Sequence, residues 1–276
     1  MPVKLPRIKA GAEPLFFPGN PDNPIACVVI HGFMASPNEV GWLGKALAQE
    51  GYAVYVPRLS GHGMKPEYMK RIRWQEWLGQ VADAISIMQQ LDKKVIVIGH
   101  SMGGLLACLA ASVYPVEGLV MAASPLTVPN YLMPWARIIQ IGLPYTRHST
   151  EASYQEAVKK EQLRLDEAPL GRIHYEKWAS RAVYELYQLI KMCPDYLSEI
   201  KVPTCLIYSE NDETVAIGDV EIAEKGLINA PLIEKHIVKD CGHLLFLDPG
   251  YADRNALVKD FIARHFSQDV KANERA

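Results

Sequence analysis

The residue pattern best able to support chemistry is a serine between two glycines, Gly99-His100-Ser101-Met102-Gly103. An apolar, β-branched run, Val95-Ile96-Val97-Ile98, precedes it, and a helical pattern follows it. A sharp turn from a strand into a helix strains the serine backbone and exposes its hydroxyl, and the glycines avoid collisions across the turn. The N–H groups at the start of the helix would face developing negative charge. This context predicts that Ser101 is a nucleophile.

The base that would activate this serine is expected late in the chain. A serine hydroxyl is a weak nucleophile at neutral pH, so it needs a base within hydrogen-bond reach and an acid that orients the base. Around such a turn the chain order is serine, acid, histidine. His243 follows the last predicted strand in the loop Asp240-Cys241-Gly242-His243 and is therefore the predicted base. The other histidines precede the serine, lie within its turn, or fall in the inserted segment, a strand or the last helix: His31, His62, His100, His148, His174, His236 and His265.

The acid is expected at the end of the preceding strand. The run Thr204–Tyr208 leads into an acidic loop that holds three carboxylates, Glu210, Asp212 and Glu213. Asp212 lies three residues before Val215, which can anchor the loop in the core. We therefore predict Asp212 as the acid, and we interpret the two glutamates as solvated loop charges.

Two backbone N–H groups are expected to bind the oxyanion of the reaction. One belongs to Met102, directly after the nucleophile. The other comes from the loop after the first long strand, where Gly32 lets the backbone bend so that the N–H of Phe33 points to the same place. His31 is expected to brace this loop, and Met34 is a candidate substrate contact.

The elements that must position these residues are typical of an α/β fold. Short β-branched runs alternate with helical patterns, which predicts a mostly parallel central sheet flanked by helices. The predicted strands are Ala26–Ile30, Ala53–Val56, Lys94–Ile98, Gly118–Ala122, Thr204–Tyr208 and Glu234–Val238. The predicted helices around them are Asn38–Glu50, Trp74–Leu91, Met102–Tyr114 and Tyr251–Phe266.

The alternation breaks between Pro125 and Ile200, where no clear strand is predicted and apolar residues recur with helical spacing. The helices predicted here are Tyr131–Ile141, Thr150–Asp166 and His174–Lys191. An insertion of this length would lie over the C-terminal edge of the sheet, which is where open α/β sheets bind ligands.

This interpretation divides the chain into two parts, a core and an inserted cap. Residues 1–124 and 201–276 are predicted to form the core, and residues 125–200 are predicted to form a helical cap over it. Trp135 and Ile139, from the apolar stretch at the start of the cap, are candidate substrate contacts.

Composition narrows the class of protein. The 276 residues carry 29 Lys and Arg against 31 Asp and Glu, a net charge of −2, so a nucleic-acid partner is not expected. No apolar run approaches the roughly 18 residues of a membrane helix, and the start Met1-Pro2-Val3-Lys4-Leu5-Pro6-Arg7 has no apolar region typical of a signal peptide. The 5 cysteines lie mostly in apolar runs, which predicts buried thiols in a reducing compartment. We expect a soluble cytoplasmic protein.

Several segments together resemble the α/β-hydrolase superfamily and, more closely, its bacterial carboxylesterase and monoacylglycerol-lipase branch. They are spread over nearly the whole predicted core: HGFMAS (31–36), VPRLSGHG (56–63), RWQEW (73–77), GHSMGG (99–104), SENDETV (209–215) and CGHLLFLD (241–248). The resemblance implies an α/β-hydrolase fold with an inserted helical cap. It also implies a triad of Ser101, Asp212 and His243 and oxyanion donors at Phe33 and Met102.

The predicted activity is hydrolysis of short- to medium-chain carboxylic esters, with monoacylglycerols among the candidates. No metal or organic cofactor is implied. Balanced charge and an apolar cap favour an uncharged, partly apolar small-molecule substrate, and no integral membrane contact is expected. Thioesterase, amidase, peptidase and C–C bond hydrolase stay open because the same triad serves them, and a ligand-binding receptor on this fold is a less favoured alternative.

Overall fold

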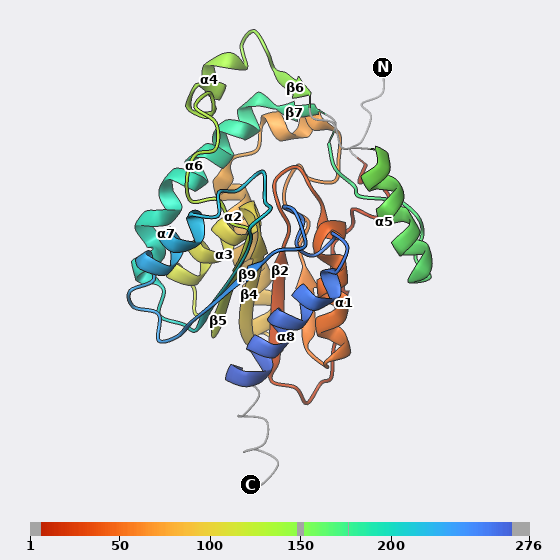
Figure 1. Ribbon diagram of the computed structural model, residues 1–276, viewed down its shortest axis with the longest axis vertical. Helices are drawn as coiled ribbons and strands as arrows, with labels where there is room; N and C mark the ends of the chain where they lie inside the picture. Colours follow the sequence, from red (N-terminus) through yellow and green to blue (C-terminus); the bar gives the residue numbers. More distant parts are fainter. Residues whose placement is uncertain (1–6, 148–151, 176, 267–276) are drawn as a thin grey trace.

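The computed structural model describes residues 7–147, 152–175 and 177–266 (Figure 1). Of the N-terminal residues 1–7, from which we predicted that the chain has no signal peptide, residues 1–6 lie outside the described residues. A seven-stranded sheet forms the centre, in the order β1-β3-β2-β4-β5-β8-β9. Every neighbouring pair is parallel except β1 and β3, so the predicted mostly parallel sheet is confirmed. The strands are β1 (Leu15–Phe17), β2 (Ile25–Ile30), β3 (Ala53–Val56), β4 (Lys94–His100), β5 (Gly118–Ala122), β8 (Thr204–Ser209) and β9 (Ile233–Val238).

The central strands are covered on both faces, which explains their uninterrupted apolar sequences. In β4, Val95 and Val97 face one hydrophobic core, while Ile96 and Ile98 face the other. Helices α2 (Trp74–Gln89), α3 (Met102–Val113) and α7 (Asp219–Gly226) contribute to the first core. Helices α1 (Gly41–Gln49) and α8 (Tyr251–Phe266) contribute to the second, and Figure 1 shows these two helices beside each other. A short 3₁₀ helix, η1 (Pro37–Val40), replaces the start of the helix predicted from Asn38, and a second, η2 (Pro66–Lys70), follows β3.

The segment between β5 and β8 contains both helices and strands. Its elements are η3 (Met133–Trp135), α4 (Ala136–Ile139), β6 (Tyr145–Arg147), α5 (Ala152–Arg164), β7 (Lys177–Ala179), α6 (Ser180–Tyr196) and η4 (Leu197–Glu199). The prediction that this segment has no strand is wrong, because β6 and β7 pair as an antiparallel ladder with Thr146 opposite Trp178. Strands of three residues are too short for their alternation to be recognised in a sequence. The predicted helix from His174 therefore begins later, at Ser180, and the predicted start at Thr150 lies outside the described residues.

Helices α5 and α6 of the inserted segment both pack on the rest of the chain. Helix α6 packs on the α2–α3 face through buried Leu189 and Ile190. Helix α5 lies near α1, where Val158 joins Trp42 in a small separate apolar cluster. The segment therefore lies over the edge at which the parallel strands end.

Two expectations from composition can be compared with the structure. All five cysteines are buried and none forms a disulfide, which confirms the predicted free thiols. Within the described ranges, no helix combines the length and the apolarity needed to cross a lipid bilayer.

Candidate active site

Ser101 lies in a sharp turn between β4 and α3, with a left-handed φ of 55° that a non-glycine residue rarely adopts. The surrounding glycines are required by close approach. A Cβ at Gly99 would lie 2.1 Å from the carbonyl oxygen of Gly103, and one at Gly103 would lie 2.2 Å from a carbonyl oxygen of β2. A Cβ at Gly104 would lie 1.8 Å from Ser124 Oγ. A polar residue held in such a strained conformation by its close surroundings is typical of a functional site.

Ser101, His243 and Asp212 form a continuous hydrogen-bonded series. His243 Nε2 lies 3.0 Å from Ser101 Oγ, and His243 Nδ1 lies 2.8 Å from Asp212 Oδ2. The other carboxylate oxygen, Asp212 Oδ1, accepts hydrogen bonds from the N–H groups of Thr214 (2.7 Å) and Val215 (2.9 Å). Since a carboxylate only accepts, His243 Nδ1 must carry a proton, which leaves Nε2 free to accept the proton of Ser101.

The carboxylate of Asp212 is enclosed, whereas the two glutamates of the same loop, Glu210 and Glu213, are exposed. The Asp212 side chain is 1% exposed. Burial would raise its pKa, but the hydrogen bond and charge of His243 and the two backbone N–H groups together hold that pKa below its ordinary value. Glu210 faces Lys239 at 3.5 Å on the surface, and Glu213 is exposed. Asp212 is thus the one carboxylate of the loop that contacts His243.

The loop that carries His243 is held by polar contacts that the sequence analysis did not identify. Ser209 Oγ, at the end of β8, donates a 2.5 Å hydrogen bond to the carbonyl oxygen of Cys241 and so ties the acid loop to the histidine loop. Arg254, which is only 4% exposed, donates to three carbonyl oxygens in residues 245–249. These contacts hold the backbone on either side of His243.

The loop after β2 lies directly against Ser101. A Cβ at Gly32 would lie 3.3 Å from Ser101 Cβ and 2.8 Å from a carboxylate oxygen of Glu39, so only glycine fits there. The backbones of Phe33 and Met102 therefore flank Ser101 from two sides, one from this loop and one from the start of α3. Backbone N–H groups in such positions can stabilise an oxyanion.

His31 braces the same loop from behind. Its Nδ1 donates to the carbonyl oxygen of Gly32 at 2.9 Å, and its Nε2 accepts the N–H of Leu59 at 3.3 Å. These partners require a neutral imidazole. Burial agrees with this requirement, because it lowers the pKa of His31 to about 4. His31 therefore has the bracing position expected of it.

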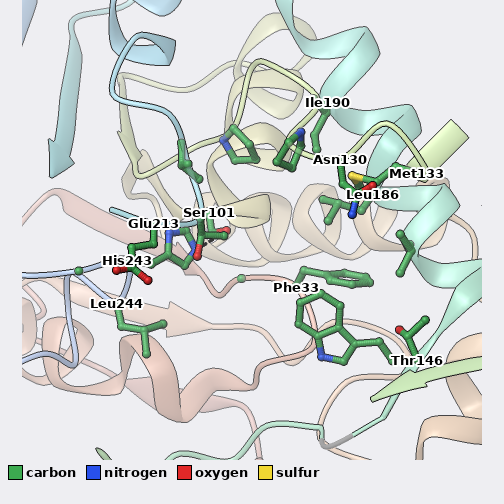
Figure 2. A pocket seen from close by; sticks show the side chains of 18 of the residues that line it. Phe33, Ser101, Asn130, Met133, Thr146, Leu186, Ile190, Glu213, His243 and Leu244 are labelled. Carbon is green, nitrogen blue, oxygen red and sulfur yellow. Dashed lines mark hydrogen bonds between the residues drawn. The ribbon is translucent and has the colours of Figure 1, made fainter. Parts of the chain in front are cut away.

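Ser101 and His243 open into a cavity of about 790 Å³ between the sheet edge and the inserted segment. Figure 2 shows these two side chains at one side of the cavity, with Phe33, Leu186 and Met133 further along it. The Phe33 ring packs edge-on against Trp178 at 5.5 Å. The wall contributed by the inserted segment is largely apolar: Leu132, Met133, Ala136, Ile139, Leu143, Trp178, Val183, Leu186 and Ile190.

Of the three predicted substrate contacts, only Ile139 lines the cavity. Met34 is 1% exposed and lies in the hydrophobic core, because the turn after Phe33 directs it inward. Trp135 is 59% exposed. A 3₁₀ helix has three residues per turn, so Met133 and Ala136 share the inward face and Trp135 is left pointing out. The structure therefore corrects the predictions for Met34 and Trp135.

A second polar group adjoins the site and was not recognised in the sequence: Glu39, His100 and Arg172. Glu39 and Arg172 line the cavity, and His100 directly precedes Ser101. Their positions along the chain carry no common pattern. In the part of the chain that the structure describes, no three His, Cys, Asp or Glu side chains are grouped so that they could hold a metal ion.

Comparison with known proteins agrees with the resemblance inferred from the motifs. The family model described as serine aminopeptidase, S33, matches residues 22–250. A thermostable monoacylglycerol lipase of Bacillus sp. (strain H-257) is 27% identical over 264 residues, which is 94% of this chain and 97% of the relative. A carboxylesterase of Bacillus subtilis (strain 168) is 20% identical over 231 residues, covering 81% of this chain and 86% of the relative.

Solved structures show the same fold. A structure from work on two metagenome-derived lipolytic enzymes superposes with a TM-score of 0.82 at 22% identity and covers 94% of this chain and 100% of its own. The monoacylglycerol lipase of Paleococcus ferrophilus superposes with a TM-score of 0.73 at 17% identity and covers 91% and 98%. At these identities the likeness establishes the architecture, and the α/β-hydrolase fold predicted from the sequence is confirmed.

Proposed function

The chain belongs to the serine aminopeptidase S33 family, and from that premise we propose that it hydrolyses short- to medium-chain carboxylic esters, monoacylglycerols among them. It is a serine hydrolase of the α/β-hydrolase type. The observation that carries the proposal is the series Asp212–His243–Ser101, which opens into a cavity whose wall from the inserted segment is largely apolar.

The reaction has two halves. Ser101 Oγ attacks the ester carbonyl carbon while His243 Nε2 takes the hydroxyl proton, and Asp212 stabilises the imidazolium that forms. The N–H groups of Phe33 and Met102 bind the oxyanion of the tetrahedral intermediate. His243 then gives the proton to the departing alcohol, which leaves an acyl-enzyme ester on Ser101. A water molecule, deprotonated by His243, attacks this ester; the bond to Ser101 Oγ then breaks, His243 returns the proton to Ser101 Oγ, and the acid is released.

The inserted segment is proposed to act as a cap that selects the acyl group. In this assignment residues 1–124 and 201–276 form the catalytic core and residues 125–200 form the cap. Leu186 and Ile190 of α6 and Ile139 of α4 line the cavity. Each methylene of the acyl chain that they cover contributes about 0.8 kcal/mol until the chain reaches the end of the cavity. The apolar character of this wall supports an uncharged acyl chain.

The setting of the reaction follows from two further features. Five buried, unpaired cysteines support a reducing compartment, and we propose the cytoplasm. A net charge of −2 supports a small-molecule ester as the partner in preference to a nucleic acid.

The proposal is tested by labelling and turnover in parallel. The protein is treated with a fluorophosphonate, and the modified residue is identified by mass spectrometry. Hydrolysis rates are then measured for aryl esters and monoacylglycerols over a series of acyl lengths. Matched acyl thioesters, acyl anilides, aminoacyl anilides and C–C bond substrates are run beside them. An adduct on Ser101 with faster turnover of esters supports the proposal. Faster turnover of another bond class refutes the ester assignment, and an adduct elsewhere refutes the role of Ser101.

A further inference from the structure

One buried carboxylate, that of Glu39 in η1, connects three separate parts of the chain. The Glu39 side chain is 3% exposed. Its Oε1 accepts the N–H of Gly32 at 2.9 Å, in the loop that carries Phe33. Its Oε2 accepts Nη2 of Arg172, from the inserted segment, at 2.8 Å. Oε1 also lies 3.1 Å from Nδ1 of His100, the residue before the nucleophile.

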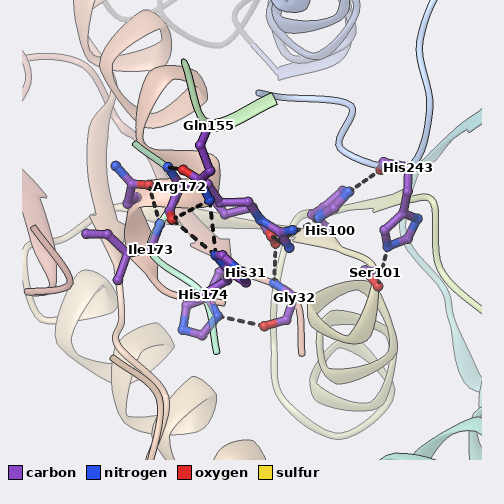
Figure 3. Close-up of polar contacts among 11 residues, drawn as sticks. His31, Gly32, His100, Ser101, Gln155, Arg172, Ile173, His174 and His243 are labelled. Carbon is purple, nitrogen blue, oxygen red and sulfur yellow. Dashed lines mark hydrogen bonds and ion pairs between the residues drawn. The ribbon is translucent and has the colours of Figure 1, made fainter. Parts of the chain in front are cut away.

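His100 extends this connection to the backbone of His243, as Figure 3 shows. His100 Nε2 lies 2.8 Å from the carbonyl oxygen of His243, while His100 Nδ1 faces Glu39. Both partners are oxygens that only accept, so both ring nitrogens must donate, and His100 is an imidazolium. Burial alone would lower the pKa of His100, but the hydrogen bond and charge of Glu39 raise it above its ordinary value.

The charges in this cluster depend on one another. Burial would raise the pKa of Glu39, but the charge of Arg172 and the hydrogen bond from His100 hold it well below its usual range. The Arg172 side chain is 14% exposed, so it too is mostly withdrawn from water. Removing one member of such a buried group leaves the others without compensation. The charges of Glu39 and Arg172 therefore compensate each other where the inserted segment lies against the active site.

We propose that Glu39, held by Arg172, is a positioning residue for hydrolysis: its carboxylate sets the loop that presents the N–H of Phe33 and, through His100, the backbone of His243. The proposal rests on the proposed function, because it concerns the same nucleophile and oxyanion site. The contact between Arg172 of the inserted segment and Glu39 would then affect the chemical step directly. An oxyanion donor held slightly out of place loses part of the stabilisation that it gives the transition state.

The test is Glu39→Gln, which keeps the shape of the side chain and removes its charge. Whichever way the amide is turned, its NH₂ group faces a donor, either Gly32 and His100 at one end or Arg172 at the other. We expect kcat for an aryl ester to fall about ten- to a hundredfold, less than the ~10²–10³ for deleting an oxyanion donor outright. KM should stay within about threefold, because the contact acts on the transition state. The rate constant for fluorophosphonate labelling should fall in parallel with kcat.

Arg172 provides the second arm. Arg172→Met should lower kcat in the same direction, and Arg172→Lys should restore part of the loss because it keeps a cation near Glu39. The double variant with Glu39→Gln should be hardly worse than Glu39→Gln alone, since both changes break one cluster. If Glu39→Gln fails to fold, the pair Arg172→Met and Arg172→Lys decides the question.

Glu167→Gln is the matched control. Glu167 also joins the inserted segment to α1, through Lys45 at 2.5 Å and Trp42 Nε1 at 3.0 Å, and neither partner lines the cavity. Its kcat and labelling rate should equal those of the parent. A folded Glu39→Gln enzyme with unchanged kcat and labelling overturns the positioning role, as does an equal loss in Glu167→Gln. Absence of labelling at Ser101 in the parent would overturn the proposed function instead.

Discussion

Replacement of Asp212 by asparagine is expected to abolish most activity, for a reason visible in the hydrogen bonds of the acid loop. Asp212 Oδ1 accepts two backbone N–H groups, those of Thr214 and Val215, so an asparagine must keep its carbonyl oxygen at that position. Its NH₂ group then faces His243 Nδ1, where Oδ2 now lies at 2.8 Å. The imidazole must accept a hydrogen bond from this NH₂ group at Nδ1 and carry its own proton on Nε2, toward Ser101. In this tautomer His243 cannot act as a base.

The size of the effect follows from comparison with a triad of the same geometry. In chymotrypsin-type enzymes the aspartate-to-asparagine change lowers kcat about 10⁴-fold, which corresponds to about 5.4 kcal/mol. We expect a loss of that order in kcat for an aryl ester. Glu210→Gln and Glu213→Gln are the controls, because neither carboxylate contacts His243, and both should stay within about threefold of the parent.

The assay compares steady-state turnover of the three variants after their melting temperatures have been measured. A folded Asp212→Asn enzyme that loses less than about tenfold in kcat would refute the tautomer argument. A large loss in Glu210→Gln would place the acid two positions earlier in the loop than the geometry does.

Three further expectations follow. Ser101→Ala should remain folded but form no fluorophosphonate adduct, and labelling of this variant on another serine would show that the nucleophile is misassigned. Leu186→Trp narrows the cavity at its apolar wall and should shift the optimum of kcat/KM to shorter acyl chains, with kcat/KM falling about fourfold for each methylene that no longer fits. Trp135→Ala, a change at an exposed side chain, should leave the chain-length profile unaltered, and equal profiles in the two variants would show that α6 does not contact the acyl chain. The pKa of Asp212 in the folded state lies below its ordinary value of 3.8, so near pH 3.8 the folded protein binds fewer protons than the unfolded chain. The stabilisation that this gives is fully present above pH 3.8 and is lost as the pH falls through the folded-state pKa. The melting temperature of the parent should therefore fall more steeply from about pH 5 to about pH 3 than that of Asp212→Asn, and parallel curves would contradict this reasoning.

The sequence alone was sufficient for features whose causes are local. The strands Ala53–Val56 and Gly118–Ala122 and the helix Tyr251–Phe266 have the predicted bounds, because buried parallel strands are continuous apolar runs and this helix has a clear apolar face. The turn at Ser101 was equally readable, since its glycines are required by contacts within a few residues of the chain or with the neighbouring strands. Chain order and strand ends restricted the candidate base and acid to one loop each, and the side chains chosen, His243 and Asp212, lie in hydrogen-bond contact.

Other features depend on what packs against a residue, and no local pattern carries that information. Trp135 and Ile139 belong to one apolar stretch, yet a change from 3₁₀ to α geometry turns the first outward and leaves the second lining the cavity. The antiparallel pair β6 and β7 joins segments separated by a whole helix, so neither strand can be recognised without its partner.

The cluster around Glu39 is the strongest example of what only the tertiary structure decided. Glu39 meets His100 61 residues later and Arg172 133 residues later, and in the sequence each is an ordinary polar residue of its own segment. A charge is expected on the surface unless a partner compensates it, and that partner is known only once the chain has folded. The sequence therefore determined which side chains are candidates for reaction, whereas folding determined which buried charges surround them, because electrostatic interaction depends on distance in space and not on distance along the chain.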